Sequence, residues 1–329
     1  MKALTFAILR HLSDGEFHSG TTLSQILGVS RASISNALQN LDQFGLIIHK
    51  IQGRGYRWVN PVQWLDREKI RAHLAQEADY FRIQILDITQ STNTLMLDGI
   101  ARNLASHNEL IHVVAAELQT GGRGRRGRQW HTGLGDSLTF SMAWQFQRGV
   151  NALSGLSLAV GVAIVRALAS VGINEVTLKW PNDLLFNFKK LGGVLIELQG
   201  DMLGPATAVI GVGINLRLPA YLRNRIDQET ADIEAIIHTF PDRNRLFAAL
   251  LTALAETLRI FDQQGFHYFR DEWVRCHAFE DKRIELYLPD GTVEQGVVRG
   301  VAADGSLVVS TVKGEQSFSG GEISLRRVS

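Results

Sequence analysis

The chain has 329 residues, 45% of them hydrophobic and 20% charged, with a formal net charge of +1. These are ordinary values for a globular protein long enough to bury a core, and they exclude an overall basic field as a signal for nucleic acid. The single cysteine, Cys276, excludes an internal disulfide and a zinc site built from cysteines. The sequence predicts neither a secretory signal nor a membrane-spanning helix, so we expect a cytoplasmic protein of two or three domains.

Residues 1–62 are predicted to form a winged helix-turn-helix domain. Apolar residues recur at helical spacing in three short segments, and two β-rich runs follow them. Ser30 is a suitable N-cap for the third helix, which we expect over residues 31–43. Gly45 is suited to the left-handed position that ends this helix.

This first domain is predicted to bind DNA. The outer face of its third helix carries side chains that can contact bases and phosphates, with no carboxylate among them, and residues 45–60 hold three Lys or Arg residues and no acidic one. The candidate DNA-binding residues are Ser30, Arg31, Ser33, Asn36, Gln39, Asn40, Lys50 and Arg54. The alternative interpretation is an ordinary amphipathic helix whose polar face meets only water.

The remainder is predicted to be an α+β enzyme domain followed by a small β domain. Residues 63–272 mix strand-like runs with helices, including a long amphipathic helix over Arg243–Gln264. Residues 273–329 hold short β runs separated by turn residues, of which the Asp-Gly pairs at 290–291 and 304–305 are strong hairpin signals. We therefore expect a central mixed α/β domain and a small C-terminal β-barrel.

The sharpest chemical signal is the segment at residues 122–128, Gly-Arg-Gly-Arg-Arg-Gly-Arg, directly after a predicted strand. Glycine lets the backbone approach a ligand closely, and arginine offers paired planar donors to phosphate and carboxylate. The pattern predicts an anion-binding loop, although composition alone leaves a flexible basic loop equally open.

Three further segments place polar side chains at the ends of predicted elements. Lys179 precedes Trp-Pro-Asn-Asp and is suited to bind an anion, whereas Asn182 and Asp183 are more simply explained as residues that stabilise a turn. Residues 91–93, Ser-Thr-Asn, begin a helix, where they can cap it or bind a polar ligand. Residues 211–215, Gly-Val-Gly-Ile-Asn, end a strand, where the glycines allow close packing.

Together these motifs resemble the biotin–protein ligase family. Ser-Thr-Asn, Gln119 with the arginine loop, Lys-Trp-Pro-Asn-Asp, Lys-Leu-Gly-Gly at 190–193 and Gly-Val-Gly-Ile-Asn occur in the order expected of that family. Gly-Gly-Glu-Ile-Ser-Leu-Arg at 320–326 resembles the end of its small C-terminal barrel, which is SH3-like. Gly-Glu-Phe-His-Ser-Gly at 15–20 and Gly-Arg-Gly-Tyr at 53–56 resemble its bifunctional members, which also repress the biotin operon.

The resemblance implies an enzyme that makes biotinyl-5'-AMP from biotin and ATP with Mg2+, and transfers biotin to a lysine of the biotin carboxyl carrier protein of acetyl-CoA carboxylase. The implied biotin-binding residues are Ser91, Thr92, Asn93, Gln119, Arg123, Gly124, Arg125 and Lys179, and Arg123, Arg125 and Lys179 are also the implied catalytic residues. The implied adenylate- and ATP-binding residues are Arg126, Arg128, Trp130, Asn182, Asp183 and Asn215. No protein cage for a metal is expected, because magnesium would arrive with ATP.

The resemblance further implies a homodimer that binds the operator of biotin-synthesis genes, with biotinyl-5'-AMP as corepressor. Three alternatives stay open: a metabolite-sensing repressor without ligase activity, a ligase that no longer binds DNA, and a related ligase that uses lipoate. Intact Arg125 and Lys179 argue against the first, and the arginine loop with Lys-Trp-Pro-Asn-Asp favours biotin over lipoate. Residues 216–229 depart from the family, since they hold no tryptophan and only Tyr221 could stack on adenine.

Overall fold

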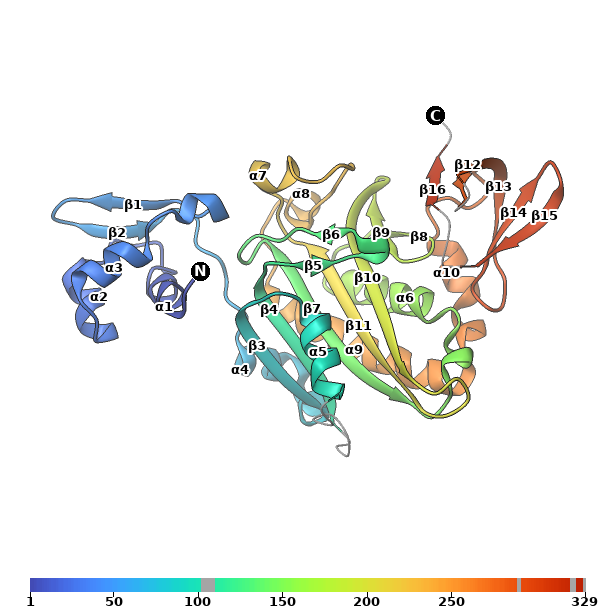
Figure 1. The fold of residues 1–329 in the computed structure, drawn as a ribbon, viewed down its shortest axis with the longest axis horizontal. Coiled ribbons are helices and arrows are strands. Elements are labelled where there is room, and N and C mark those ends of the chain that lie inside the picture. Colours follow the sequence, from blue (N-terminus) through green and yellow to red (C-terminus); the bar gives the residue numbers. More distant parts are fainter. Residues whose placement is uncertain (102–109, 289–290, 320–323, 328–329) are drawn as a thin grey trace.

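The computed structural model describes residues 1–101, 110–288, 291–319 and 324–327, and these form three units arranged in a row (Figure 1). The N-terminal unit lies at one end, the large central unit in the middle, and the C-terminal strands at the other end. Asp290 and most of the motif at 320–326 fall outside the described residues. Within the described ranges, no helix is long and apolar enough to cross a membrane.

The N-terminal unit has the predicted order of three helices and a hairpin. Its elements are α1 (Ala3–His11), α2 (Gly20–Leu27), α3 (Arg31–Ala37), β1 (Ile48–Ile51) and β2 (Gly55–Trp58). Ser30 caps α3 as predicted, since its Oγ accepts a hydrogen bond from the N–H of Ser33 at 3.0 Å. The helices and the hairpin share one buried cluster, which includes Phe6, Leu23 and Trp58.

The third helix is shorter than predicted. It ends at Ala37, because Asn40 adopts a left-handed conformation (φ 56°) from which a short 3-10 helix, η1 (Leu41–Phe44), begins. Gln39 and Asn40 therefore lie in the turn after the helix, where both are exposed. Gly45 takes the predicted left-handed position (φ 74°), although it ends η1 and not α3.

A close backbone contact explains why residue 55, at the end of the turn between β1 and β2, is a glycine. The N–H and C=O groups of His18 and Tyr56 exchange two hydrogen bonds of 2.9 Å. Gly55 (φ 104°) has no room for a side chain, since a Cβ there would lie 2.0 Å from the carbonyl oxygen of His18. The motif at 15–20 therefore packs tightly, through its backbone, against the motif at 53–56 in the hairpin.

The central unit is built on a seven-stranded mixed sheet in the order β3-β4-β7-β11-β10-β9-β8. Its strands are β3 (Phe81–Thr89), β4 (Ile111–Gln119), β7 (Ser137–Phe146), β8 (Thr177–Lys179), β9 (Asp183–Phe186), β10 (Lys189–Gly200) and β11 (Ala206–Asn215). Strands β3 and β4 are parallel, and the other neighbours are antiparallel. β9 is not expected from the sequence, because so short an apolar run has no period that identifies it.

Helices cover both faces of this sheet. On one face, α6 (Leu156–Ser170) and α9 (Arg243–Gln264) pack together in the main core. On the other face, α5 (Thr92–Ala101) packs through Met96 against Val114 and Val209. The remaining helices are α4 (Arg67–Leu74), α7 (Ala220–Arg223), α8 (Ile233–Ile237) and α10 (Arg270–Cys276). The sheet is thus buried under α6 and α9 on one face, while α5 covers only part of the other face and leaves room over β10 and β11 for a site.

The C-terminal unit is an antiparallel sheet in the order β15-β14-β13-β12-β16. Its strands are β12 (Arg283–Tyr287), β13 (Val293–Val301), β14 (Leu307–Thr311), β15 (Gly314–Phe318) and β16 (Ser324–Arg327). In the described part of the unit, β15 and β16 are the two edges and no pairing closes the sheet into the predicted barrel.

Candidate active site

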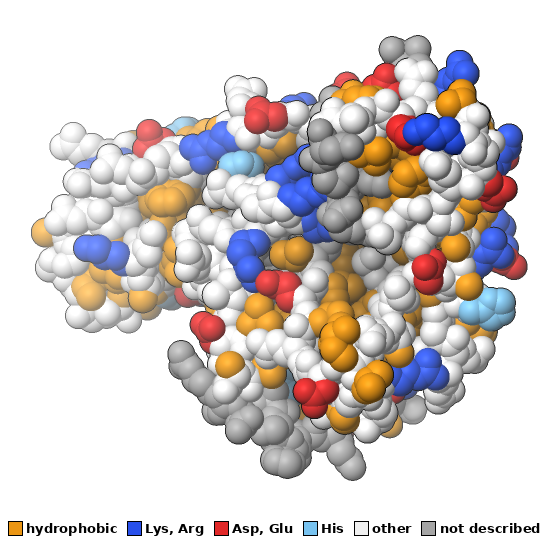
Figure 2. All heavy atoms as spheres, turned by 45° about the vertical axis from the view of Figure 1, so that its right-hand side comes forward, with side chains coloured by type: hydrophobic (Ala, Val, Ile, Leu, Met, Phe, Trp, Pro, Cys, Tyr) orange, Lys and Arg blue, Asp and Glu red, His pale blue; other side chains and the backbone are white. Residues whose placement is uncertain are grey.

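One pocket gathers most of the predicted site residues. It lies where the start of α5, the hairpin of β5 (Gly122–Arg123) and β6 (Gln129–Trp130), and the β8–β9 turn meet over β10 and β11. The predicted residues that line it are Ser91, Thr92, Asn93, Gln119, Arg123, Gly124, Arg125, Arg126, Arg128, Trp130, Lys179, Asn182 and Asp183. On the face shown in Figure 2, lysine and arginine side chains gather near the middle of the molecule.

One end of the pocket holds buried polar side chains that orient one another. The N–H and Oγ1 of Thr92 donate to Oε1 of Gln119 at 2.7 and 3.2 Å. The Oγ of Ser141 on β7 lies 2.7 Å from Oγ1 of Thr92 and 2.5 Å from Oδ1 of Asn93. Because these groups are held before any ligand arrives, this end is suited to a small head group with its own donors and acceptors.

Ser141 and Glu197 are not predicted from the sequence, yet both contact side chains that line the pocket. Ser141 is fully buried, and Glu197 on β10 accepts from Nδ2 of Asn93 at 2.9 Å and from Arg123 at 2.5 Å. The available signal for Ser141 is the alternation of hydroxyl residues at 137, 139 and 141, which places three of them on one face of a strand. No comparable signal marks Glu197.

The glycines at 211 and 213 leave room for two pocket side chains. A Cβ on Gly211 would lie 2.2 Å from Oδ1 of Asn93, and a Cβ on Gly213 would lie 2.6 Å from the indole of Trp130. The predicted reason for this motif, close packing, is confirmed. Because the packed groups line the pocket, the motif shapes the site as well.

The arginine loop is a compact turn between β5 and β6. The N–H of Gly124 donates to the carbonyl of Arg128 at 2.7 Å, and Arg126 has a left-handed φ of 56°. Arg125 is half-buried and donates to Oδ1 of Asn182 at 3.2 Å. Burial and the neighbouring Arg126 lower the pKa of Arg125. Positive charge is thus concentrated here, and an anion in the pocket would relieve it.

The β8–β9 turn brings Lys179 to the same pocket. Asn182 ties this turn to β10, since its Nδ2 donates to a β10 carbonyl at 2.7 Å, and Asp183 pairs with Nζ of Lys190 at 2.7 Å. Nζ of Lys179 lies 5.8 Å from the ring centroid of Phe279, beside the C-terminal unit. Asn182 and Asp183 therefore stabilise the turn, as the simpler interpretation predicts, and also face the pocket.

Asn215, predicted to bind the adenylate, lies away from the pocket lining. It is buried, and its Nδ2 donates to two backbone carbonyls, of Lys190 and Ala231, at 3.4 and 3.1 Å. Its amide therefore ties the end of β11 to neighbouring backbone, and its assignment to the adenylate stays a prediction.

Tyr221, the one candidate for stacking on adenine, also lies elsewhere. Its hydroxyl donates to Asp136 at 3.3 Å, and its ring lies against Gly45 of the N-terminal unit, where a Cβ would be 2.0 Å away. Gln228 is a residue from the same segment that does line the pocket. The segment at 216–229 thus reaches both the pocket and the N-terminal unit.

The predicted DNA-binding side chains lie around α3 and the hairpin. Those that are exposed are Ser30, Arg31, Asn36, Gln39, Asn40, Lys50 and Arg54, and Ser33 is partly exposed. Nζ of Lys50 lies 3.5 Å from Oγ of Ser35, which places the hairpin beside α3. The guanidinium of Arg54 lies 4.3 Å from the ring centroid of Phe17. Helix and wing therefore form one surface that is suited to the backbone and bases of a duplex.

Comparison with known proteins agrees with this geometry. A model of the biotin/lipoate A/B protein ligase family matches residues 85–215, a helix-turn-helix domain model matches 5–57, and a biotin protein ligase C-terminal domain model matches 281–326. Biotin protein ligase from Aquifex aeolicus, solved with biotin and ATP, is 26% identical, with a TM-score of 0.61 over 75% of this chain and 99% of that one. Fold and pocket together define an enzyme of the biotin protein ligase class.

Relatives that match over nearly the whole chain narrow the assignment within this class. The chain is 36% identical to the bifunctional ligase/repressor BirA of Salmonella typhimurium over 96% of this chain and 95% of that protein. The BirA of Escherichia coli K12 is also 36% identical, over the same shares of the two chains. The chain belongs to the family of bifunctional biotin ligase/repressors.

Proposed function

We propose that this protein activates biotin with ATP as biotinyl-5'-AMP and transfers biotin to a lysine of the biotin carboxyl carrier protein of acetyl-CoA carboxylase. The observation that carries the proposal is one pocket that joins a buried polar end to a cluster of arginine and lysine. We assign the polar end, with Ser91, Thr92, Asn93 and Gln119, to the biotin head group. Arg123, Gly124, Arg125 and Lys179 are assigned to the biotin carboxylate.

The basic end of the pocket is suited to adenylate formation. The carboxylate of biotin must approach the α-phosphate of ATP, and both groups are anions. Arg123, Arg125 and Lys179 offset that repulsion and stabilise the charge of the transition state. The mixed anhydride that results is itself the activated species, so a protein nucleophile is not needed. Ordering of the arginine loop over the adenylate would keep water out until the carrier lysine attacks.

Nucleotide and magnesium are assigned to the outer part of the same pocket. We propose that Arg126, Arg128, Trp130, Asn182 and Asp183 contact ATP and the adenylate. Asp183 is already paired with Lys190, and the described residues hold no group of three or more His, Cys, Asp or Glu side chains arranged for a metal. These donors fit a magnesium ion carried by ATP phosphates, with at most one protein carboxylate, and the ion would neutralise the departing pyrophosphate.

The first half-reaction can be tested without the carrier protein. With magnesium, the purified protein should exchange labelled pyrophosphate into ATP when biotin is present and not when lipoate replaces it. Exchange with lipoate alone would assign the chain to the lipoate ligases. Tight binding of biotin without exchange would favour a metabolite-sensing repressor.

We further propose that the protein represses biotin-synthesis genes, with biotinyl-5'-AMP as corepressor. The helix-turn-helix unit places α3 for the major groove and the hairpin along the backbone. A salt-titrated binding assay on the promoter of those genes tests this. If the protein with biotin and ATP does not prefer that promoter over random duplex, the ligase function stands alone.

A homodimer is proposed through the open edge of β10. β9 pairs with β10 only as far as Gly193, so in the described part of the sheet no strand pairs with residues 195–200 on that side. Leu198, Met202 and Leu203 beside this edge are 37%, 59% and 88% exposed. Edges of this kind pair readily with a second copy, and antiparallel pairing supplies the two-fold symmetry that two operator half-sites require.

Replacing Leu203 by glutamate is therefore expected to keep the liganded protein monomeric. A charge at an apolar strand edge opposes pairing, because it would have to be buried against the second copy. Sedimentation velocity with biotin and ATP measures the change, and pyrophosphate exchange should stay at the level of the parent. A dimer as tight as that of the parent would place the interface elsewhere.

Replacing Arg54 by alanine is expected to weaken binding to every duplex and to lower the slope of log affinity against log salt by about one unit for each half of the dimer that loses its contact. Arg54 is assigned to a phosphate, which carries no sequence information. Asn36→Ala is the contrasting variant, expected to relax base preference at a cost of about 1–3 kcal/mol. Equal losses for specific and random duplex in Asn36→Ala would contradict its role in base recognition, and a loss confined to the specific duplex in Arg54→Ala would contradict its role as a phosphate contact.

Replacing Ser141 by alanine is expected to weaken biotin binding roughly three- to tenfold, the equivalent of one net hydrogen bond. The hydroxyl orients Thr92 and Asn93, so the rate of exchange at saturating biotin should change little. Ser170→Ala, which removes a bond to the carbonyl of Ala167 at the end of α6, is the control. Titration calorimetry gives both affinities, and an unchanged value for Ser141→Ala would show that the network does not need this hydroxyl.

We keep the boundaries 1–62, 63–272 and 273–329 for the three domains, and we infer that the C-terminal sheet is SH3-like. The buried clusters support the first boundary, because the N-terminal helices and hairpin share one cluster. The second is less sharply marked, since the core of the C-terminal sheet, including Ile284 and Val309, is continuous with that of the central unit.

A further inference from the structure

A second groove lies at the edge of the central sheet, between α4 and the start of β3. β3 is the outermost strand of the sheet, and among the residues that the structure describes no strand pairs with its outer side. The groove is lined by Arg67, Glu68, Arg71, Phe81, Arg82 and Ile83. β3 has nine residues, so its two ends lie about 25 Å apart. Because the pocket begins beyond the other end of β3, at Ser91, the groove is separate from it.

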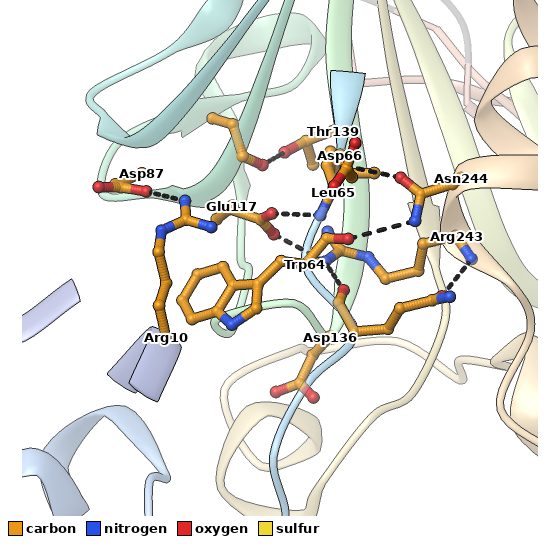
Figure 3. Close-up of polar contacts among 12 residues, drawn as sticks. Arg10, Trp64, Leu65, Asp66, Asp87, Glu117, Asp136, Thr139, Arg243 and Asn244 are labelled. Carbon is orange, nitrogen blue, oxygen red and sulfur yellow. Dashed lines mark hydrogen bonds and ion pairs between the residues drawn. The ribbon is translucent and has the colours of Figure 1, made fainter. Parts of the chain in front are cut away.

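The helix that forms one side of this groove is held in a fixed position. Its N-cap, Asp66, accepts hydrogen bonds from two backbone N–H groups of the first turn. The N–H of Asp66 donates in turn to Oδ1 of Asn244 on α9 at 2.7 Å (Figure 3). Ile70, on the inner face of α4, is buried in the main core. Arg67 and Arg71, one helical turn apart, are therefore presented on a rigid support.

The groove carries excess positive charge, since its lining holds three arginines and one glutamate. Arg71 is positioned by the carbonyl of Ala78 at 3.1 Å and by the carboxylate of Asp79 at 2.8 Å. Arg67 pairs at 3.6 Å with Glu68, its neighbour in the chain, and both side chains are largely exposed. Exposed pairs of this kind contribute little, so an incoming carboxylate can replace Glu68 as the partner of Arg67.

The third arginine lies on the other face of the strand edge. Successive side chains of a strand point to opposite faces. Phe81 and Ile83 are buried in the main core, which α4 also joins. Arg82, between them, is exposed and points to the opposite face. The open edge of β3 is thus flanked by arginines on both faces.

An open strand edge of this kind is a template for an added strand. It presents unpaired N–H and C=O groups, and an extended peptide can pair with them. The side chains of the added strand alternate between the two faces. One set would meet Arg67 and Arg71, and the other set would meet Arg82. A matching peptide therefore carries acidic residues at consecutive positions.

We propose that this groove binds an extended acidic segment of a partner protein, added as a strand to β3 with its carboxylates against Arg67, Arg71 and Arg82. A peptide is favoured over a nucleic acid, because the open backbone of β3 pairs with another backbone and not with phosphates. Glu68 and Asp79 beside the arginines also oppose a continuous run of phosphates. Since the groove is separate from the pocket, this site does not depend on the proposed function.

The test uses a fluorescein-labelled peptide, Thr-Glu-Glu-Val-Glu-Glu-Thr, and fluorescence anisotropy with the full-length protein. Binding should saturate and weaken as salt is added. Arg67→Glu and Arg82→Glu should each weaken it about fivefold, and the double variant about twentyfold or more, because each change replaces an attraction by a repulsion. The control is Arg299→Glu, which reverses an exposed arginine paired with Asp281 in the C-terminal unit and should bind as the parent does. Thermal unfolding should show all variants to be folded.

A modified peptide tests the pairing of the backbones. Methyl groups on its backbone nitrogens keep every charge but remove the N–H donors that an added strand needs, so it should bind at least fivefold more weakly. Failure of the unmodified peptide to bind, equal binding of the methylated form, or full affinity in the double variant would each overturn the proposal. A single-stranded oligonucleotide of equal charge that displaces the peptide more effectively than unlabelled peptide would make the groove a nucleic-acid site and overturn it as well.

Discussion

Replacing Lys179 by methionine is expected to slow biotin-dependent pyrophosphate exchange by about a hundredfold or more. Adenylate formation brings a carboxylate against a phosphate, and Lys179 supplies positive charge on the β8–β9 side of the pocket where they meet. Methionine keeps a long apolar side chain in place of the lysine stem near Phe279, so the loss reports on the charge. Affinity for biotin should fall much less, because the head group is assigned to the opposite end of the pocket.

The matched control is Lys189→Met. Lys189 begins β10, outside the pocket lining, and its Nζ lies 3.8 Å from a carboxylate oxygen of Glu229. Its exchange rate should equal that of the parent, and thermal unfolding should show both variants to be folded. An exchange rate for Lys179→Met within about twofold of the parent would make Lys179 an ordinary surface charge, whose replacement usually changes stability by no more than about 0.5 kcal/mol.

Most of the pocket could be predicted from the sequence because its motifs are local. Glycines, arginines and a lysine at the ends of predicted helices and strands can be recognised from residue type and spacing alone. Glu197 could not be found in this way, and the alternation of hydroxyl residues that includes Ser141 does not show which of them contacts the pocket residues, because both roles depend on strand register. Gly211 of β11 is paired with Ser141 on one side and with Leu195 on the other, and Asn93 lies over that glycine. Only the paired sheet brings these residues together.

The extra length predicted for the third helix has a similar origin. Leu38 and Leu41 continue the helical spacing of α3, so periodicity alone extends that helix. Both are buried in the structure as well, at 9% and 5% exposure, because the turn at Asn40 and the 3-10 helix after it still direct them inward. Asn215 shares a motif with two pocket glycines, yet its amide satisfies buried carbonyls. A motif shows that a segment is used, but not which of its residues meets the ligand.

Replacing Arg125 by glycine is expected to release biotinyl-5'-AMP roughly ten- to a hundredfold faster. A charge-assisted, two-pronged hydrogen bond to phosphate contributes about 1.5–3 kcal/mol, and Arg125 is the half-buried arginine of the loop that already faces the β8–β9 turn. The mixed anhydride that escapes remains reactive toward amines. The variant should therefore biotinylate bystander lysines, for example on albumin added to the reaction, while adenylate synthesis continues.

Two further variants separate the causes of this release. Arg125→Ala removes the guanidinium without the extra backbone freedom of glycine, so equal release from both variants assigns the effect to the side chain. Arg148→Gly removes an arginine that donates to the carbonyl of Gln263 at 2.7 Å, away from the pocket, and it should retain the adenylate as the parent does. If Arg125→Gly holds labelled biotinyl-5'-AMP through rapid gel filtration as long as the parent, the phosphate contact belongs to another residue. Arg123 would be the next to test, because its present partner, Glu197, is a carboxylate that the ligand's own anion could replace.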